Sequence, residues 1–423
     1  MNFLPIRLGS ILDLRAGTQW DKETLRHETR LRSELLQKLE IGPGDVVGVF
    51  HGNSLEFFAD LFAVWQVGAT AACLNENLTA PELANVCDFL SAKLLLTDLK
   101  QAPEIEATVP VVCTRERLDE LPGNPEGVNG PASLDQPALI LFTSGTTGLP
   151  KGVIQTHATN LVPMRRCRDL FTKRDQPRFF SYLPLSHIAE RQVVEFSSVN
   201  SGGEVWFNES LETLARDLPQ CRPNIFFGPP RVWEQLKQSI TAKFGGAEAL
   251  EAALAADEAG VQAMVVGGLG LDDTDYLLTA AAPTPPPLIH WWERVGLEIC
   301  EGFGQTEAMG LIATDPSYRR VGSIGRPVGE VEVKIGDNDE MLIKAEGCTP
   351  GYYNRPEKTA ELWQDGWLHT GDKIEIDEDG FIFITGRVKD YFKTIQGKFV
   401  APPPIEGLFA DNPHSEQQCL LGR

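Results

Sequence analysis

The stretch of residues 44–98 alternates between short apolar runs and segments with helical spacing, and this order constrains the fold more than any other feature of the chain. The apolar runs cover residues 45–50, 69–74 and 92–97, and each has the length of a buried strand. Helical patterns separate them, so the order is β-α-β-α-β. That order predicts a parallel sheet covered by helices on both faces.

Capping residues mark where the two helices begin. Asn53 or Ser54 precedes the first helical pattern, which continues to Val67. Thr79 precedes the second, and Pro81 falls in its first turn. We therefore expect helices to start at these positions.

The rest of the chain divides into two regions with different sequence patterns. A second α/β segment is predicted for about residues 179–279, and within it residues 246–260 carry the longest uninterrupted helical pattern. After Tyr318, short strand-like runs alternate with Asp/Gly turns, which predicts a small antiparallel barrel or sheet. Those runs are residues 331–335, 341–344, 373–376 and 381–384.

Composition excludes several classes of protein. The 423 residues carry 38 basic and 59 acidic side chains, a net charge of −21, which argues against nucleic-acid binding and against simple electrostatic docking on anionic membranes. No apolar run approaches the roughly 18 residues of a membrane helix, so only a peripheral membrane contact is left open. The N-terminus lacks a secretory pattern, and the eight cysteines form no C-x-x-C pair. We expect a cytoplasmic, reduced location.

Residues 141–152 (LFTSGTTGLPKG) carry the strongest chemical signal. Glycines let backbone N–H groups approach an anion, and hydroxyl and ammonium groups add further donors, as polyphosphate binding requires. Pro150 before Lys151 distinguishes the segment from a Walker loop. Residues 153–157 look extended, so a strand–loop–strand is predicted. The alternative is a Gly/Ser/Thr-rich hairpin without a ligand.

This segment resembles the phosphate loop of the adenylate-forming superfamily, which includes acyl-CoA synthetases, luciferases and amino-acid-adenylating domains. Three further blocks follow in the family's order: residues 301–307 (EGFGQTE), 367–372 (WLHTGD) and 386–390 (GRVKD). Each block alone could be a turn or a surface ion pair. Together they extend the resemblance over about residues 140–406.

The resemblance implies a site for ATP or AMP and Mg²⁺. The aromatic ring of Phe303, where tyrosine is usual, would stack on adenine, Thr306 would contact the α-phosphate, and Asp372 would hold both ribose hydroxyls. The implied nucleotide ligands are Thr143, Ser144, Gly145, Thr146, Thr147, Gly148, Lys151, Ala281, Ala282, Gly302, Phe303, Gly304, Thr306, Asp372 and Arg387. The implied metal ligands are Thr147 and Glu307.

The same resemblance implies catalytic and hinge residues. The catalytic set is Lys151, Thr306, Glu307 and Lys393, of which Lys393 belongs to a block that acts in thioester formation. Lys389 occupies the hinge position between a large and a small domain.

Three segments resemble long-chain acyl-CoA synthetases in particular: residues 181–191 (SYLPLSHIAER), 228–234 (GPPRVWE) and 393–406 (KTIQGKFVAPPPIE). They imply a fatty acid and coenzyme A as substrates, with His187 and Gly304 at the acyl pocket. For a lone histidine such as His187 the alternative is a packed core side chain.

The chain also departs from the family pattern. Ala280 stands where the loop beside adenine often has glycine, and it would cost about 1 kcal/mol if its φ were positive. The stretch of residues 231–279 is shorter than in typical long-chain members, which leaves the acyl length open. No lysine follows Lys398, whereas the family's adenylation lysine lies near its C-terminus.

Taken together, these patterns predict an α/β protein. Its large domain (residues 1–386) would contain two helix-flanked, mainly parallel sheets (1–180 and 181–317) and an antiparallel β-barrel-like part (318–386). Residues 387–423 would be the hinge and the beginning of a small α+β domain, which suggests a truncated chain. The expected function is fatty acyl-CoA formation through acyl-AMP; the alternatives are a nucleotide- or acyl-adenylate-binding protein with little turnover and a ligase that loads a carrier protein.

Overall fold

The computed structural model describes Arg7 and residues 9–98, 108–118, 133–143, 151–309 and 312–389, together with the backbone of residues 392–393 and 399–400. The chain forms two compact units. The first unit contains Met1–Arg168, Lys173–Pro223 and Thr349–Thr359, and the second contains Asp169–Thr172, Asn224–Cys348 and Ala360–Arg423.

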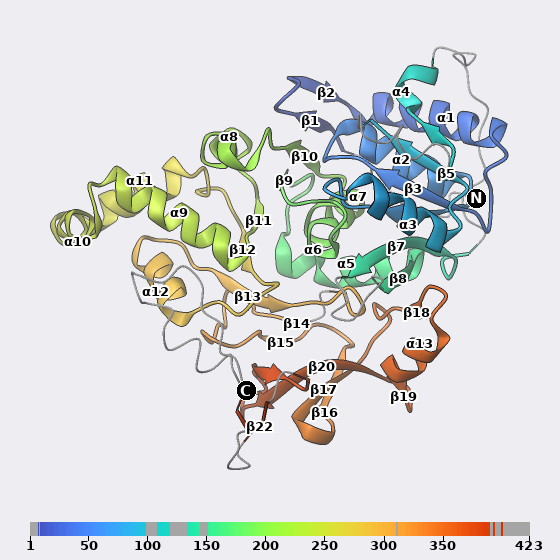
Figure 1. Cartoon of the computed structure of the whole chain (residues 1–423). Coiled ribbons are helices and arrows are strands. Elements are labelled where there is room, and N and C mark those ends of the chain that lie inside the picture. Colours follow the sequence, from blue (N-terminus) through green and yellow to red (C-terminus); the bar gives the residue numbers. More distant parts are fainter. Residues whose placement is uncertain are drawn as a thin grey trace. The chain divides into compact units, whose positions relative to one another are not determined.

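The predicted parallel sheet forms the centre of the first unit (Figure 1). Its strand order is β18-β8-β7-β4-β3-β5-β6, in which β7, β4, β3, β5 and β6 are parallel and β8 and β18 are antiparallel. The strands are β3 (Val46–Phe50), β4 (Thr70–Cys73), β5 (Leu94–Thr97), β6 (Val111–Val112), β7 (Pro137–Thr143), β8 (Lys151–Thr156) and β18 (Gly351–Tyr352). The predicted order of strands and helices over residues 44–98 is confirmed.

The helices of this segment begin where the sequence predicted. The Ser54 hydroxyl accepts a hydrogen bond from Phe57 N–H (3.2 Å) and caps α2 (Leu55–Gln66). Thr79 precedes α3 (Ala80–Leu90), and its N–H donates to the Glu82 carboxylate (2.9 Å). One face of α3 packs on the sheet through Leu83, Val86 and Leu90, which places an apolar core between helix and strands.

The first unit also contains a strand that the sequence did not reveal. β1 (Ile11–Asp13) pairs in parallel with β10 (Glu204–Phe207), which is parallel to β9 (Arg178–Ser181), and β2 (Thr18–Trp20) lies antiparallel to β1. A three-residue strand has no periodicity to detect. The helical segments are α1 (Lys22–Lys38), α4 (Thr114–Arg117), α5 (His157–Phe171), α6 (Ile188–Glu190), the π-helical turn Arg191–Phe196, α7 (Ser197–Ser201), the 3₁₀ turn Leu211–Thr213 and α8 (Leu214–Cys221).

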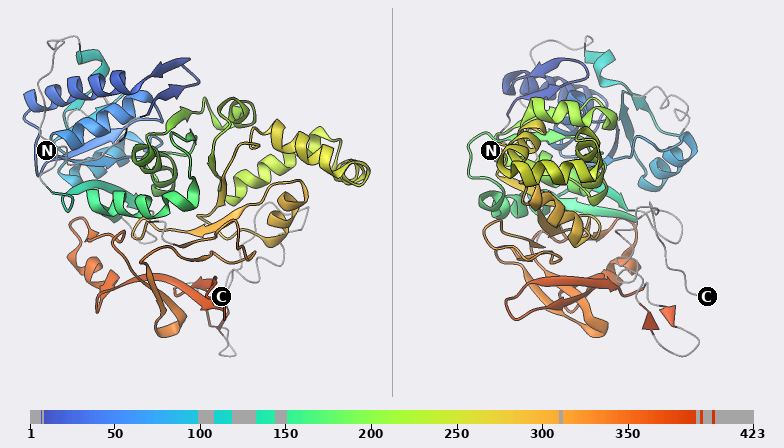
Figure 2. Two further views of the ribbon diagram at one scale, coloured as in Figure 1. Left: turned by 180° about the vertical axis from the view of Figure 1, so that it is seen from behind. Right: turned by 90° about the vertical axis from the view of Figure 1, so that its left-hand side faces the viewer.

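The second unit begins with parallel strands and a group of helices. β11 (Ile225–Phe227), β12 (Tyr276–Thr279) and β13 (Cys300–Phe303) are parallel, and β14 (Ile312–Ala313) and β15 (Arg326–Pro327) continue the sheet in antiparallel pairing. The helices are α9 (Pro230–Lys243), α10 (Ala247–Ala256), α11 (Glu258–Gly268) and α12 (Pro286–Arg294), and the first three are yellow-green in Figure 2.

The uninterrupted helix predicted over residues 246–260 is wrong. Asp257 separates α10 from α11. Its carboxylate accepts a hydrogen bond from Gly260 N–H (3.0 Å) and so caps the second helix. Asp is a strong capping residue, and here capping prevails over the helical pattern around it.

The C-terminal part of the second unit is the predicted antiparallel sheet, orange and red in Figures 1 and 2. β20 lies beside β17 and β19 and also pairs with β21. Its elements are β16 (Glu332–Ile335), the 3₁₀ turn Asp337–Asp339, β17 (Glu340–Lys344), β19 (Trp363–Gln364), β20 (Trp367–Ile376) and β21 (Ile382–Arg387); α13 (Pro356–Leu362) precedes β19, and β22 (Phe392–Lys393) pairs with β23 (Phe399–Val400). Within the described ranges, no helix has the length and apolar character needed to cross a membrane.

Candidate nucleotide site

The two ends of the predicted phosphate loop meet in the first unit. Thr143 ends β7 and lies opposite Lys151, the first residue of β8, in an antiparallel pair. The Lys151 ammonium lies 5.0 Å from the centre of the Tyr352 ring. This confirms the two predicted strands. Residues 144–150 lie outside the described residues, so the roles of Ser144, Gly145, Thr146, Thr147 and Gly148 stay predictions.

In the second unit, the fold places two predicted nucleotide segments at one sheet edge. β12 and β13 are parallel, with Thr279 opposite Glu301. The carboxyl ends of parallel strands meet at the same edge, which is where open α/β sheets bind ligands. Ala281 and Ala282 follow β12, while Phe303 ends β13 and Gly304 follows it.

The loop after β12 contains backbone strain at a position other than the predicted one. Ala281 has φ of 73°, in the left-handed region, whereas Ala280 does not have positive φ. The Thr279 and Thr284 hydroxyls are 2.9 Å apart and close the loop. The condition stated for Ala280 is therefore not met, and the positive φ occurs at its neighbour Ala281.

Asp372 is the centre of a hydrogen-bonded cluster within the second unit. Its side chain is only 6% exposed. Arg387, its register partner across β20 and β21, donates to Oδ1 (2.9 Å). Gln305 donates to Oδ2 (2.6 Å) and also to the Thr370 carbonyl (3.0 Å). Three separate sequence blocks thus converge on one carboxylate.

Sequence reasoning identified Asp372 and Arg387 but missed Gln305. The signal was present, because Gln305 lies inside the block 301–307, between Gly304 and Thr306. It occupies the variable position of that block, so the resemblance assigned it no role.

The other predicted members of the block are accessible to different degrees. Gly304 is exposed, whereas Gly302, Phe303, Thr306 and Glu307 are partly buried. Among the residues that the structure describes, no group of three or more His, Cys, Asp or Glu side chains is arranged to hold a metal. Glu307 is the described member of the predicted metal pair, so its assignment stays a prediction.

The predicted acyl-pocket histidine lies on a fixed segment of the first unit. His187 is exposed, which argues against the alternative of a packed core histidine. The Asn53 amide donates to the Leu183 carbonyl (2.7 Å) and accepts from Leu185 N–H (3.1 Å). The Arg191 guanidinium, fully buried, donates to the Leu185 carbonyl (3.0 Å).

Glu190 holds the same segment from its other side. It is 1% exposed and accepts a hydrogen bond from Tyr182 N–H (3.1 Å). Burial raises the pKa of Glu190 to about 8, although hydrogen bonds from Ser181, Tyr182 and Leu183 oppose the shift. Glu190 and Arg191 of the segment 181–191 therefore support the turn that carries His187.

The remaining predicted residues lie near the end of the described chain. Lys389 follows β21 and is exposed. Lys393 is paired with Phe399 in the β22–β23 ladder, and its side chain lies outside the described residues. The hinge and thioester roles stay predictions.

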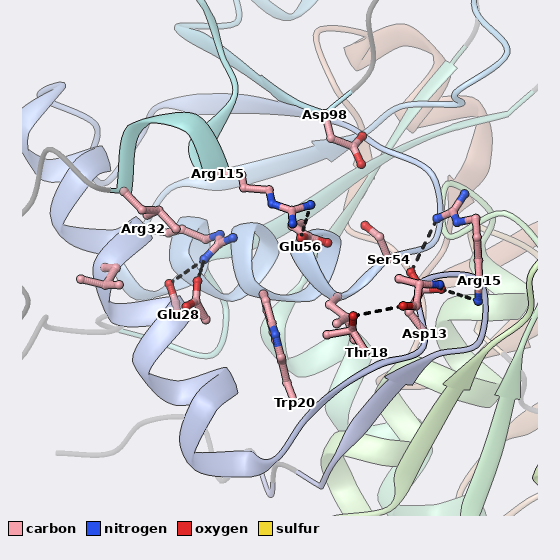
Figure 3. A pocket seen from close by; sticks show the side chains of 14 residues that line it. Asp13, Arg15, Thr18, Trp20, Glu28, Arg32, Ser54, Glu56, Asp98 and Arg115 are labelled. Carbon is pink, nitrogen blue, oxygen red and sulfur yellow. Dashed lines mark hydrogen bonds and ion pairs between the residues drawn. The ribbon is translucent and has the colours of Figure 1, made fainter.

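A cavity of about 650 Å³ also lies in the first unit (Figure 3). Charged side chains on its wall pair with one another: Arg15 lies 3.7 Å from Asp13, and Arg115 lies 3.4 Å from Glu56. Since these charges already compensate each other, we assign the cavity no ligand.

A network of charges adjoins this cavity, and two of its members, Arg32 and Asp98, line the cavity wall. Asp60 lies 2.9 Å from His51 and 3.0 Å from Arg32, and it accepts a hydrogen bond from the Thr114 hydroxyl (2.8 Å). The second imidazole nitrogen lies 3.1 Å from Asp98. Burial opposes protonation of His51, but the two aspartates outweigh it and raise the pKa to about 9. The network joins α1, α2, α4 and the ends of β3 and β5.

Comparison with known proteins places this architecture in a family. The family described as AMP-binding enzyme matches residues 18–353. The chain belongs to this family of adenylate-forming enzymes, the superfamily that includes the acyl-CoA ligases.

Several curated relatives are similar over most of their length. The long-chain-fatty-acid–CoA ligase FadD13 of Mycobacterium tuberculosis is 28% identical over 420 residues, which cover 92% of this chain and 77% of the relative. The feruloyl-CoA synthase of an Amycolatopsis species is 27% identical, with 95% and 79% covered.

Solved structures show the same fold. The o-succinylbenzoate CoA synthetase (MenE) of Bacillus subtilis, in complex with its acyl-adenylate intermediate, superposes with a TM-score of 0.82 at 21% identity, covering 97% of this chain and 81% of that one. Its complex with ATP and magnesium ion gives the same TM-score, with 97% and 83% covered.

Proposed function

We propose that this protein activates a medium- or long-chain fatty acid with ATP, first to acyl-AMP and then to acyl-CoA. The observation that best supports this proposal is the hydrogen-bonded cluster around Asp372, which joins the sequence blocks that contain Phe303, Arg387 and Thr370. The names of the curated relatives support a fatty acid as the substrate, although feruloyl-CoA synthase is among them.

In the proposed first step, a carboxylate oxygen attacks the α-phosphorus and pyrophosphate leaves. A carboxylate accepts hydrogen bonds and so suits the two ribose hydroxyls; Asp372 would hold the sugar while Phe303 stacks on adenine. Thr306 and Lys151 would contact phosphate oxygens, and Glu307 would bind Mg²⁺. Bound Mg²⁺ would neutralise phosphate charge, and the chain itself contributes mainly positioning.

In the proposed second step, the sulfur of coenzyme A attacks the acyl carbonyl carbon, the thiol proton is lost and AMP leaves. Lys389 would be the hinge between the two conformations, and His187 would lie at the acyl pocket. The exposure of His187 on a rigidly held turn supports a ligand-contacting role.

The direct test supplies the purified chain with ATP, Mg²⁺, palmitate and coenzyme A, and follows pyrophosphate and acyl-CoA. Ferulate replaces palmitate in a parallel assay, and a phosphopantetheinylated carrier protein replaces coenzyme A in another. Pyrophosphate release that depends on palmitate, followed by palmitoyl-CoA, is the expected result. ATP binding without pyrophosphate release would contradict the ligase and favour a nucleotide-binding protein.

Asp372→Ala tests the ribose assignment. Hydrogen bonds to a charged group contribute about 1.5–3 kcal/mol each, so we expect ATP affinity to fall roughly ten- to a hundredfold in equilibrium binding. Glu378→Gln, which removes an exposed carboxylate from the turn after β20, is the matched control and should bind ATP normally. Unchanged affinity in Asp372→Ala would show that the sugar is held elsewhere.

A further inference from the structure

The ammonium group of Lys151 lies over an aromatic ring that a distant part of the chain supplies. Its nitrogen is 5.0 Å from the centre of the Tyr352 ring. A cation at this distance over the face of a tyrosine is attracted by the negative potential of the ring. Tyr352 belongs to the segment Thr349–Thr359, which is part of the same compact unit as Lys151. Lys151 therefore has a contact that its own loop sequence does not predict.

The pairing of β18 with β8 explains why these two side chains meet. Tyr352 lies directly opposite Val153 in this antiparallel pair. Lys151 and Val153 are two residues apart on β8, so their side chains lie on the same face of the sheet. Tyr352 is therefore the diagonal neighbour of Lys151, at a distance that a long side chain and an aromatic ring can span.

Burial and backbone hydrogen bonds hold the ring of Tyr352 in place. The residue is only 8% exposed. Its N–H donates to the Thr359 hydroxyl (3.0 Å), and the N–H of the next residue, Tyr353, donates to the Gly152 carbonyl (2.8 Å). The side chain of Lys151, in contrast, is a flexible chain of four methylene groups. The ring is thus a fixed surface on which a flexible cation rests.

We propose that Tyr352 is a positioning residue that holds the Lys151 ammonium ready for the β- and γ-phosphates of ATP. The inference rests on the proposed function, in which Lys151 contacts phosphate oxygens and Thr306 takes the α-phosphate. Ordering a flexible side chain on binding costs free energy, and that cost is smaller when the free protein already holds the side chain. Tyr352 supplies this order before the nucleotide arrives, through the electrostatic potential of its ring.

The experiment measures dissociation constants of ATP and AMP, with Mg²⁺ present, for the wild type, Tyr352→Phe and Tyr352→Leu. Tyr352→Phe keeps the ring face and should keep the wild-type ratio between the two affinities. Tyr352→Leu keeps an apolar side chain but loses the ring, so ATP affinity should fall roughly two- to tenfold, the factor for ordering one long side chain. AMP lacks the β- and γ-phosphates, so its affinity should not change.

Further variants separate the ring potential from a general structural effect. Replacement of Tyr352 by pentafluorophenylalanine nearly keeps the shape of phenylalanine but reverses the charge distribution of the ring, so ATP affinity should fall as in Tyr352→Leu. This variant also provides the comparison with Tyr352→Phe if melting temperatures show that Tyr352→Leu fails to fold.

Two controls test whether the effect passes through Lys151. Tyr353→Leu is the matched control, because the ring of this neighbouring tyrosine packs against Phe89, and it should keep the wild-type ratio between ATP and AMP. In the Lys151→Met background, Tyr352→Leu should change the ratio no further, because both residues act through the same contact.

The outcomes distinguish the inference from the function on which it rests. If the wild type binds no ATP, the proposed function is wrong, and the inference with it. If the wild type binds ATP and Tyr352→Leu binds it equally well, the inference alone is wrong. Equal weakening of ATP and AMP in Tyr352→Leu would also overturn it, as would a pentafluorophenylalanine variant that binds ATP as tightly as Tyr352→Phe.

Discussion

At the scale of single residues, Ala281 adopts a backbone conformation that is unfavourable in free energy, and the fold tolerates it. Its φ of 73° is a conformation that residues with a Cβ rarely adopt, and it lies in the loop after β12, at the sheet edge where ligands bind in folds of this kind. Such strain persists only when the surroundings determine the backbone. Here the close approach of the Thr279 and Thr284 hydroxyls supplies that constraint.

Replacing Ala281 by glycine should therefore stabilise the second unit. Glycine adopts positive φ without the clash of Cβ, and we expect the free energy of unfolding to rise by about 1 kcal/mol in urea titrations. Ala280→Gly is the matched control, since Ala280 lacks positive φ. It should lower the free energy by about 0.5–1 kcal/mol, because glycine there only adds freedom to the unfolded chain. A destabilising Ala281→Gly would contradict the strain argument.

At the scale of elements, the segment between β9 and α6 is held by side chains from other parts of the first unit. Asn53 binds it at Leu183 and Leu185, while Glu190 and Arg191 bind it from the following helix. From sequence, Asn53 was a candidate helix cap, but Ser54 caps α2 and Asn53 is free to fix the neighbouring segment. A hydrogen bond from an asparagine side chain to a backbone group far away in the sequence produces no local sequence pattern, so it could not be predicted from the sequence.

Asn53→Ala should lower the stability of the first unit. The Leu183 carbonyl and the Leu185 N–H would lose their partners, and a buried polar group left unpaired costs about 1–3 kcal/mol. Chemical denaturation measures the loss in free energy of unfolding. Asn77→Ala, at an exposed asparagine, is the control and should stay within about 0.5 kcal/mol of wild type. An equal effect of the two substitutions would show that the Asn53 contacts add no stability.

At the scale of the whole molecule, we expect the first unit to have a pH dependence of its own, because the charged network around His51 lies within it. The folded-state pKa of His51 is raised to about 9, and an unfolded histidine titrates near 6.5. Between these values the folded state keeps a proton that the unfolded state has lost. The contribution of His51 is complete below about pH 6.5 and disappears as pH rises through about 9.

The free energy of unfolding of the first unit should thus fall by roughly 3 kcal/mol between pH 6.5 and 9.5 through His51. Hydrogen exchange, resolved by peptide, should show α1 and α2 losing protection over this range after correction for the intrinsic exchange rate. His51→Gln should flatten the dependence, whereas His290→Gln, at an exposed histidine of α12, should leave it unchanged. The same slope in His51→Gln would mean that another group titrates.

The parts of the fold that sequence predicted have local causes. Strand and helix periods, the Ser54 and Thr79 caps, and the Asp/Gly turns of the final sheet are encoded within a few residues. The break at Asp257 and the strand β1 were missed because a competing cap and a distant strand partner decided them. In the candidate site, the sequence blocks that resemble the family located Asp372 and Arg387. The role of Gln305 followed only from the structure, because Gln305 contacts Asp372, which lies 67 residues later in the chain.

The return of residues 349–359 to the first unit has a consequence for how the chain folds as it is made. β18 covers the edge strand β8, with Gly351 opposite Ile154, and the Tyr353 hydroxyl donates to the Leu90 carbonyl (3.0 Å). The two paired residues are 197 positions apart (351 − 154). At about 5–20 residues per second on the ribosome, the β8 edge waits roughly 10–40 s for its partner. During that interval the unpaired edge of β8 can pair with strands of other chains, so we expect aggregation of nascent chains to be more probable before β18 is synthesised.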